Sequence, residues 1–167
     1  MKVTSKNANK MLNQLNEELK TLQENERGVM TFNAAVVEDV ESCRPEYDYW
    51  KTQEEIKVLN KKIAKIKHAI NCFNVTTIVD GYDMSIDEML VYIPQLTEQV
   101  KKLDKMKSNL PKSRVVGFSR SNIIDYVYAN YDTKEITKEW LKAKEELANA
   151  QIALDKTNIT KEFELDI

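Results

Sequence analysis

Arginine, serine and tyrosine gather in one short stretch of this 167-residue chain, residues 113–132. The stretch holds Arg114 and Arg120, which are two of the four arginines, together with three serines and three tyrosines. The guanidinium group is a planar fork that suits phosphate or carboxylate, and the N–H groups and hydroxyls of a Ser- and Gly-rich turn converge on anions. These residue types therefore indicate a site for a small anion.

Two tyrosines follow the arginines at the spacing that is typical of a β-strand. Residues 122–131 alternate, with Ile124, Tyr126 and Tyr128 on one side of the expected strand. Aromatic rings beside arginines can stack a base while the arginines take its phosphates. The other interpretation is that both rings pack against the helices.

A second polar group lies near the end of an expected helix and consists of Asn71, Asn74 and Thr77. Asparagine at a helix end usually acts as a cap. If these side chains are buried, they need hydrogen-bond partners. We consider a ligand, Asn158 or a neighbouring subunit as those partners.

These segments together give a predicted ligand-binding set. The arginines would take the negative charge, the serines and Asn122 would hydrogen-bond to the ligand, and one tyrosine would stack on its ring. The predicted residues are Arg114, Ser119, Arg120, Ser121, Asn122, Tyr126, Tyr128, Asn71, Asn74, Thr77 and Asn158.

The arginines belong to a basic part of the chain. Residues 101–120 carry seven Lys and Arg residues against one acid, Asp104, although the net charge of the chain is −2. We interpret the lysines of residues 101–107 as a solvated helix face. The two arginines follow that helix, in the Ser- and Gly-rich turn.

Enzyme signatures are absent from the sequence. The chain has one histidine, His68, and contains no GxSxG, CxxC, HExxH or P-loop motif. Cys72 lies four residues after His68, so the two side chains can touch on a helix, but no third orienting group is evident. The acids of residues 80–88 lack the spacing of a calcium loop, and Asp80-Gly81 is typical of a turn. We predict no catalytic residues, no metal and no cofactor.

The apolar pattern predicts a mainly α fold, an elongated four-helix hairpin bundle with coiled-coil-like seams and a small β element near the Arg–Ser turn. The clearest seam is Ile56, Leu59, Ile63, Ile66, Ile70 and Phe73, whose alternating spacings of three and four form a heptad pattern. The expected single domain, 1–167, has helices at about 4–26, 45–74, 85–110 and 133–157 and extended segments, paired into a small sheet, at about 28–37, 122–131 and 159–166.

Local signals define some helix ends. Ser85 and Glu88 match a capping box, and Asp132 can cap the last helix. The third helix has an apolar stripe that includes Leu90, and Pro94 inside it should kink the helix or split off its first two turns.

Composition limits the partners. Hydrophobic residues make up 42% and charged residues 31% of the chain. The net charge creates no field toward DNA or a membrane, and no apolar run approaches the roughly 20 residues of a membrane span. The chain's start lacks the apolar stretch of a signal peptide, so we expect a cytoplasmic protein with neither DNA nor membrane as partner.

Self-association is a further expectation. The heptad seams and the aromatic residues Tyr47, Tyr49 and Trp50 indicate faces that are buried between subunits, hence a homo-oligomer. The alternative is a monomeric bundle.

Three short motifs resemble those of the septicolysin-like proteins, a family of small helical proteins from bacteria and phages. They are INCFNVTTIVDG at 70–81, SRSNI at 119–123 and NITKEF at 158–163. The resemblance implies long helical hairpins with a small β element, and it implies little about chemistry.

Taken together, the sequence favours a non-enzymatic protein that binds and sequesters a small, anionic, nucleotide-like ligand. A phage-encoded sponge for a host immune signalling nucleotide, with an anti-defence role, would have this character. Two alternatives stay open: a helical interaction or scaffold protein without a small ligand, and a hydrolase of a nucleotide-like substrate.

Overall fold

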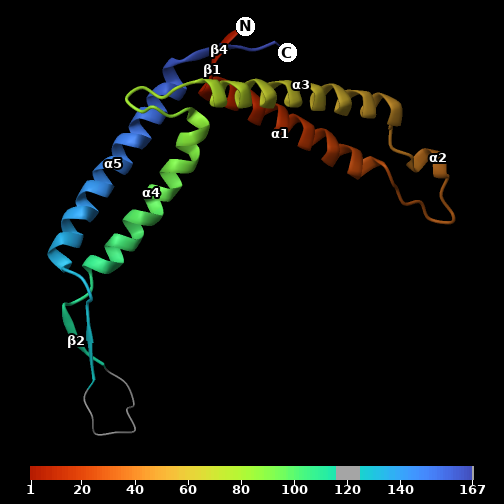
Figure 1. Cartoon of the computed structure of the whole chain (residues 1–167). Coiled ribbons are helices and arrows are strands. Elements are labelled where there is room, and N and C mark those ends of the chain that lie inside the picture. Colours follow the sequence, from red (N-terminus) through yellow and green to blue (C-terminus); the bar gives the residue numbers. More distant parts are fainter. Residues whose placement is uncertain (116–124, 167) are drawn as a thin grey trace. The chain divides into compact units, whose positions relative to one another are not determined.

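The computed structural model describes residues 1–115 and 125–166, which form two compact units. The first unit contains Met1–Thr76 and the end of the chain from Asn158, and the second contains Thr77–Thr157. The expected single domain stays a prediction. The elements are β1 (Lys2–Thr4), α1 (Ser5–Val29), α2 (Val40–Cys43), α3 (Tyr49–Thr76), α4 (Ile86–Lys107), β2 (Lys112–Arg114), β3 (Tyr126–Tyr128), α5 (Thr133–Thr160) and β4 (Glu162–Glu164) (Figure 1). The predicted mainly helical bundle with a small β element is confirmed.

The first unit is a hairpin of α1 and α3 closed at one end by a two-stranded sheet (Figure 1). Strands β1 and β4 are antiparallel, with Val3 opposite Phe163. The core of this end consists of buried residues from β1, from both helices and from the position after β4: Val3, Ala8, Ile66, Ile70 and Leu165. The heptad repeat places Ile66 and Ile70 on the face of α3 that meets this core.

The predicted seam of α3 is confirmed from Leu59 to Phe73, whereas Ile56 is half-buried and α1 is covered less. Leu59, Ile63, Ile66, Ile70 and Phe73 are buried. The Phe73 ring stacks on Phe163, with 4.6 Å between the ring centroids. On α1 the apolar stripe of Met11, Leu15, Leu19 and Leu22 is half-buried throughout. One partner helix therefore covers the α1 stripe incompletely.

A carboxylate ties the other end of this hairpin together. Glu26 accepts hydrogen bonds from the Tyr47 hydroxyl and the Gln53 side-chain amide, each at 2.6 Å. The Asp48 carboxylate accepts from the Lys51 N–H at 3.1 Å, which caps the first turn of α3. Because of this cap, α3 begins at Tyr49, and the predicted start at residue 45 is wrong.

The extended segment predicted at 28–37 is also wrong. Gly28 and Val29 are still in α1, and the residues up to 37 include no strand. Val36 and Val37 are almost fully exposed. Strand propensity largely reflects packing against neighbouring strands and burial, and these two residues gain neither.

The second unit is the hairpin of α4 and α5 (Figure 1). The Ser85–Glu88 capping box is present as predicted. α4 continues through Pro94, so the predicted split is wrong, and the alternative of a kink stays a prediction. Met89 is buried where Leu90 was expected, and Leu90 is half exposed. Gly81 has φ +87° in the predicted turn before α4, a backbone conformation that favours glycine.

The strands form two separate sheets instead of the one expected. β1 pairs with β4 in the first unit, and β2 pairs with β3 in the second. The sequence pattern missed β1 and β2, because a three-residue strand is too short to show alternation. In residues 1–115 and 125–166, no helix has the length and apolar character needed to cross a membrane.

Replacing Ile66 with alanine tests the core of the first unit. Ile66 is fully buried, so Ile66→Ala should lower the free energy of unfolding by about 3 kcal/mol through lost burial and a cavity. Urea denaturation followed by circular dichroism measures this change. Lys65→Ala, at the exposed neighbouring position, is the matched control. Equal stability of the two variants would contradict this core.

The Tyr47–Glu26 hydrogen bond makes stability depend on pH. The bond to the carboxylate raises the pKa of Tyr47 to about 12, above the ordinary value of about 10. The folded state therefore holds the phenol proton more tightly, and this stabilisation is complete below about pH 10 and is lost as pH rises toward 12. The melting temperature of Tyr47→Phe should lie below that of the unmodified protein at about pH 8, and the gap should close toward pH 12. Tyr49→Phe is the control, and a gap that does not change with pH would contradict the assignment.

Candidate functional site

The β2–β3 hairpin brings together four of the side chains that can recognise an anionic ring. Its register places Lys112 opposite Tyr128 and Arg114 opposite Tyr126. Directly opposed residues of an antiparallel pair share a face, and residues two apart in a strand share it too. Lys112, Arg114, Tyr126 and Tyr128 therefore form one surface, here called the basic aromatic face, and Val127 lies on the other side.

Contacts within the basic aromatic face agree with this placement. The Lys112 ammonium lies 4.1 Å from the centroid of the Tyr126 ring and 5.3 Å from that of Tyr128. The two ring centroids are 6.4 Å apart and the rings are inclined at 51°. This geometry is that of a cation held over a pair of aromatic faces.

Both rings are accessible to a ligand. Tyr126 is 46% exposed and Tyr128 is 61% exposed. The interpretation in which these tyrosines simply pack against the helices is therefore wrong. Arg114 is exposed as well.

Hydrogen bonds anchor the hairpin to the end of α4. The Tyr131 hydroxyl donates to the Met106 carbonyl at 2.9 Å and accepts from the Asn109 side-chain amide at 2.7 Å. The Ala129 N–H donates to the Pro111 carbonyl at 3.1 Å. Tyr131 thus fixes the base of the hairpin without belonging to the basic aromatic face.

Four predicted site residues lie outside the described residues: Ser119, Arg120, Ser121 and Asn122. The sequence places them between β2 and β3. Their predicted contacts to a ligand stay predictions.

Asn71, Asn74 and Asn158 of the predicted set belong to the first unit. Asn71 is exposed on α3 and Asn158 is half-buried on α5. The side-chain oxygen of Asn74 is buried and has no hydrogen-bond partner among the described residues. Asn158, which we considered as a partner, therefore does not satisfy it.

Thr77 does not join the basic aromatic face within one chain. It precedes α4, and its carbonyl accepts from the Ile86 N–H at 3.0 Å. The hairpin follows the other end of α4 (Figure 1). That helix has 22 residues, which corresponds to about 33 Å.

The lysines before the hairpin have local partners, in agreement with a solvated helix face. Lys101 pairs with Glu98 at 2.7 Å, and Lys107 pairs with Asp104 at 3.1 Å. The Lys107 ammonium also lies 4.0 Å from the centroid of the Trp140 ring. Lys101 thus lies on the solvated face of α4, whereas Lys107 also packs against α5.

Other chemistry-bearing groups are sparse. The Cys72 sulfur lies 3.6 Å from His68 Nε2, so the two side chains do touch on α3. Both residues are exposed. The described part of the chain holds no group of three or more His, Cys, Asp or Glu residues that could hold a metal ion.

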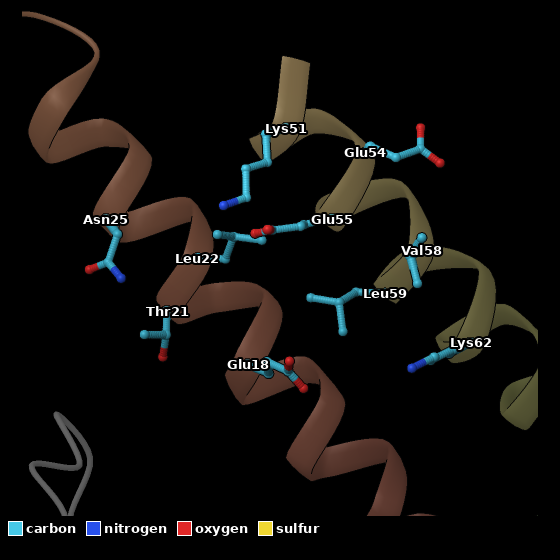
Figure 2. Close-up of a pocket in the computed structure, with 10 residues that line it drawn as sticks. All are labelled: Glu18, Thr21, Leu22, Asn25, Lys51, Glu54, Glu55, Val58, Leu59 and Lys62. Atoms are coloured by element: carbon cyan, nitrogen blue, oxygen red, sulfur yellow. The ribbon is translucent and has the colours of Figure 1, made fainter. Parts of the chain in front are cut away.

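Two features were missed by sequence reasoning. Lys112 was counted as basic, but only the strand register shows that it shares a face with Tyr126 and Tyr128. The other feature is an open groove of 810 Å³ between α1 and α3, into which Leu22, Glu55 and Leu59 point (Figure 2). The sequence signal for the groove is the apolar stripe of Met11, Leu15 and Leu22 on α1, which α3 leaves half-buried.

Comparison with known proteins supports the fold. No protein-family model and no curated protein matches this chain. Its structure is similar to the crystal structure of a conserved protein of unknown function from Corynebacterium diphtheriae, with a TM-score of 0.60 and 17% sequence identity. The match covers 98% of this chain and 100% of the other. At this identity the likeness shows the fold alone, and the resemblance to septicolysin-like proteins stays a prediction.

Removing the Tyr131 hydroxyl should loosen the hairpin. Tyr131→Phe deletes the bond to the Met106 carbonyl, a loss of about 1 kcal/mol. The Ala129 amide should then exchange with solvent about five-fold faster in NMR hydrogen-exchange experiments. Tyr82→Phe, a hydroxyl deletion before α4, should leave this rate unchanged. An Ala129 rate that does not respond to Tyr131→Phe would contradict the anchoring role.

Proposed function

We propose that this protein binds a small anionic molecule with an aromatic ring, such as a nucleotide, on the basic aromatic face and holds it unchanged. One observation supports this proposal above all: the strand register gathers two cations and two exposed tyrosines on one side of a hairpin. Strand alternation places Asp125 toward the opposite side.

The chemistry of this face matches a nucleotide-like ligand in two ways. A base can stack on a tyrosine ring, which is worth roughly 1–3 kcal/mol per base. Arg114 offers a planar fork to a phosphate, and the Lys112 ammonium lies beside the same rings. Arg120, Ser119, Ser121 and Asn122 would add donors from the segment between the strands.

Holding the ligand without turnover fits the side chains of this face. Lys112, Arg114, Tyr126 and Tyr128 include no imidazole, carboxylate or thiol, and imidazole is the group that most often acts as a general base. Such binding would suit a protein that sequesters a signalling nucleotide, including a phage-encoded sponge for a host immune signal.

A ligand panel tests this function. The protein is dialysed against nucleoside mono-, di- and triphosphates and cyclic dinucleotides, and bound species are identified by mass spectrometry after denaturation. We expect at least one ring-bearing phosphate to bind and to be released intact. Inorganic pyrophosphate and adenosine, which carry only the charge or only the ring, should bind more weakly.

Variants locate the binding on the hairpin. Arg114→Ala and Tyr126→Ala should each weaken binding about ten-fold, because each removes either the phosphate contact or a stacking surface. Val127→Ala, on the opposite side of the same hairpin, is the matched control and should bind normally. If no panel member binds, or if all three variants behave alike, the proposed function is wrong. Recovery of a cleaved ligand would instead favour a hydrolase.

A further inference from the structure

The space between α1 and α3 is a continuous groove along the first unit. A cavity of 810 Å³ shares Glu18 and Lys62 with a neighbouring cavity of 430 Å³. It shares Leu22, Lys51 and Glu55 with another cavity of 490 Å³ on its other side. These three cavities are here called the α1–α3 groove.

Apolar side chains that two helices cannot cover line this groove. Met11, Leu15 and Leu22 of α1 line it and stay half-buried. Val58 of α3 also lines it and is 42% exposed. A helix pair buries one stripe of each member, and further apolar surface calls for another helix.

The charges along the groove are arranged so that its two ends complement each other. One end carries Glu18 and Lys62, and the other carries Lys51 and Glu55. Figure 2 shows Glu55 and Lys62 directed from α3 toward the space between the helices. On α3 these two residues lie at equal sequence distances from the midpoint between Val58 and Leu59.

We propose that the α1–α3 groove is closed by the α1–α3 hairpin of a second copy of this chain, packed antiparallel about a two-fold axis near Val58 and Leu59. Two-fold symmetry makes each contact occur twice. Glu55 then meets Lys62 of the partner subunit. The apolar residues of both grooves meet in the centre.

The charges of the groove fit this antiparallel direction. A two-fold axis that crosses the helices places α3 over α3 of the partner subunit, so Glu55 meets Lys62 of the partner subunit twice. Opposite charges that are brought together at an interface favour that arrangement. The self-complementary charge pattern of the groove therefore favours a second copy as its occupant.

This interface is independent of the proposed ligand site. The groove lies in the first unit and the basic aromatic face lies in the second. A mutation that prevents dimerisation should thus leave ligand binding unchanged, and a mutation that prevents ligand binding should leave dimerisation unchanged.

Charge reversal followed by sedimentation velocity tests the interface in the full-length protein. We expect the unmodified protein to be a dimer at about 100 μM. Glu55→Lys and Lys62→Glu should each weaken the dimer about ten-fold, because each creates two like-charge contacts. The double variant restores opposite charges and should return within about three-fold of the original Kd.

A second pair of variants tests the apolar part of the groove. Val58→Glu should produce a monomer, because it places two carboxylates at the centre of the interface. Val91→Glu, at an exposed valine on α4 in the second unit, should remain a dimer. Circular dichroism verifies that both variants keep their helical content.

Three outcomes would overturn this proposal: a monomeric unmodified protein, a dimer that is insensitive to Val58→Glu, or a double charge variant that stays as weak as the single ones. The last outcome would show that Glu55 does not face Lys62 of the partner subunit. A heterologous helix bound in the groove would leave the isolated protein monomeric.

Discussion

Two helices can bury only the stripe that each presents to the other, and this limit explains most of the structure. In the first unit, the stripe of α3 is buried from Leu59 to Phe73, whereas the leucines of α1 stay half-buried. The stability of the unit therefore depends on contacts at the two ends of the hairpin. The β1–β4 sheet closes one end over the core, and the Glu26 carboxylate joins α1 to the start of α3 at the other.

The second unit also consists of two paired helices, and it too buries only the stripe that each helix presents to the other. Its two helices meet through long side chains: the Tyr92 hydroxyl of α4 donates to the Glu146 carboxylate of α5 at 3.3 Å, and the Lys107 ammonium of α4 lies over the Trp140 ring of α5. The β2–β3 hairpin beyond α4 has backbone pairing and the Tyr131 anchor to hold it. Its aromatic side chains remain exposed, so they are free to meet a ligand.

Sequence reasoning succeeded where the cause of the structure is local or periodic. The heptad of Ile63, Ile66 and Ile70 predicted the buried face of α3, and the Ser85–Glu88 pair predicted the start of α4. It failed where tertiary partners decide. Residues 28–37 have strand propensity but no strand to pair with, and Lys112 joins the tyrosines only through a register that the sequence does not display. The α1–α3 groove likewise depends on how much of a stripe one partner helix covers.

The central claim is that the basic aromatic face is the ligand site, and an NMR titration with ATP tests it most directly. Binding on this face should change the chemical shifts of the Tyr126 and Tyr128 rings and of the Arg114 side chain and leave the methyl groups of Leu22 and Val58 unchanged. The shifts should diminish as salt is added, because exposed charges are screened. Saturable shifts that are confined to the α1–α3 groove, with a silent hairpin, would contradict the account.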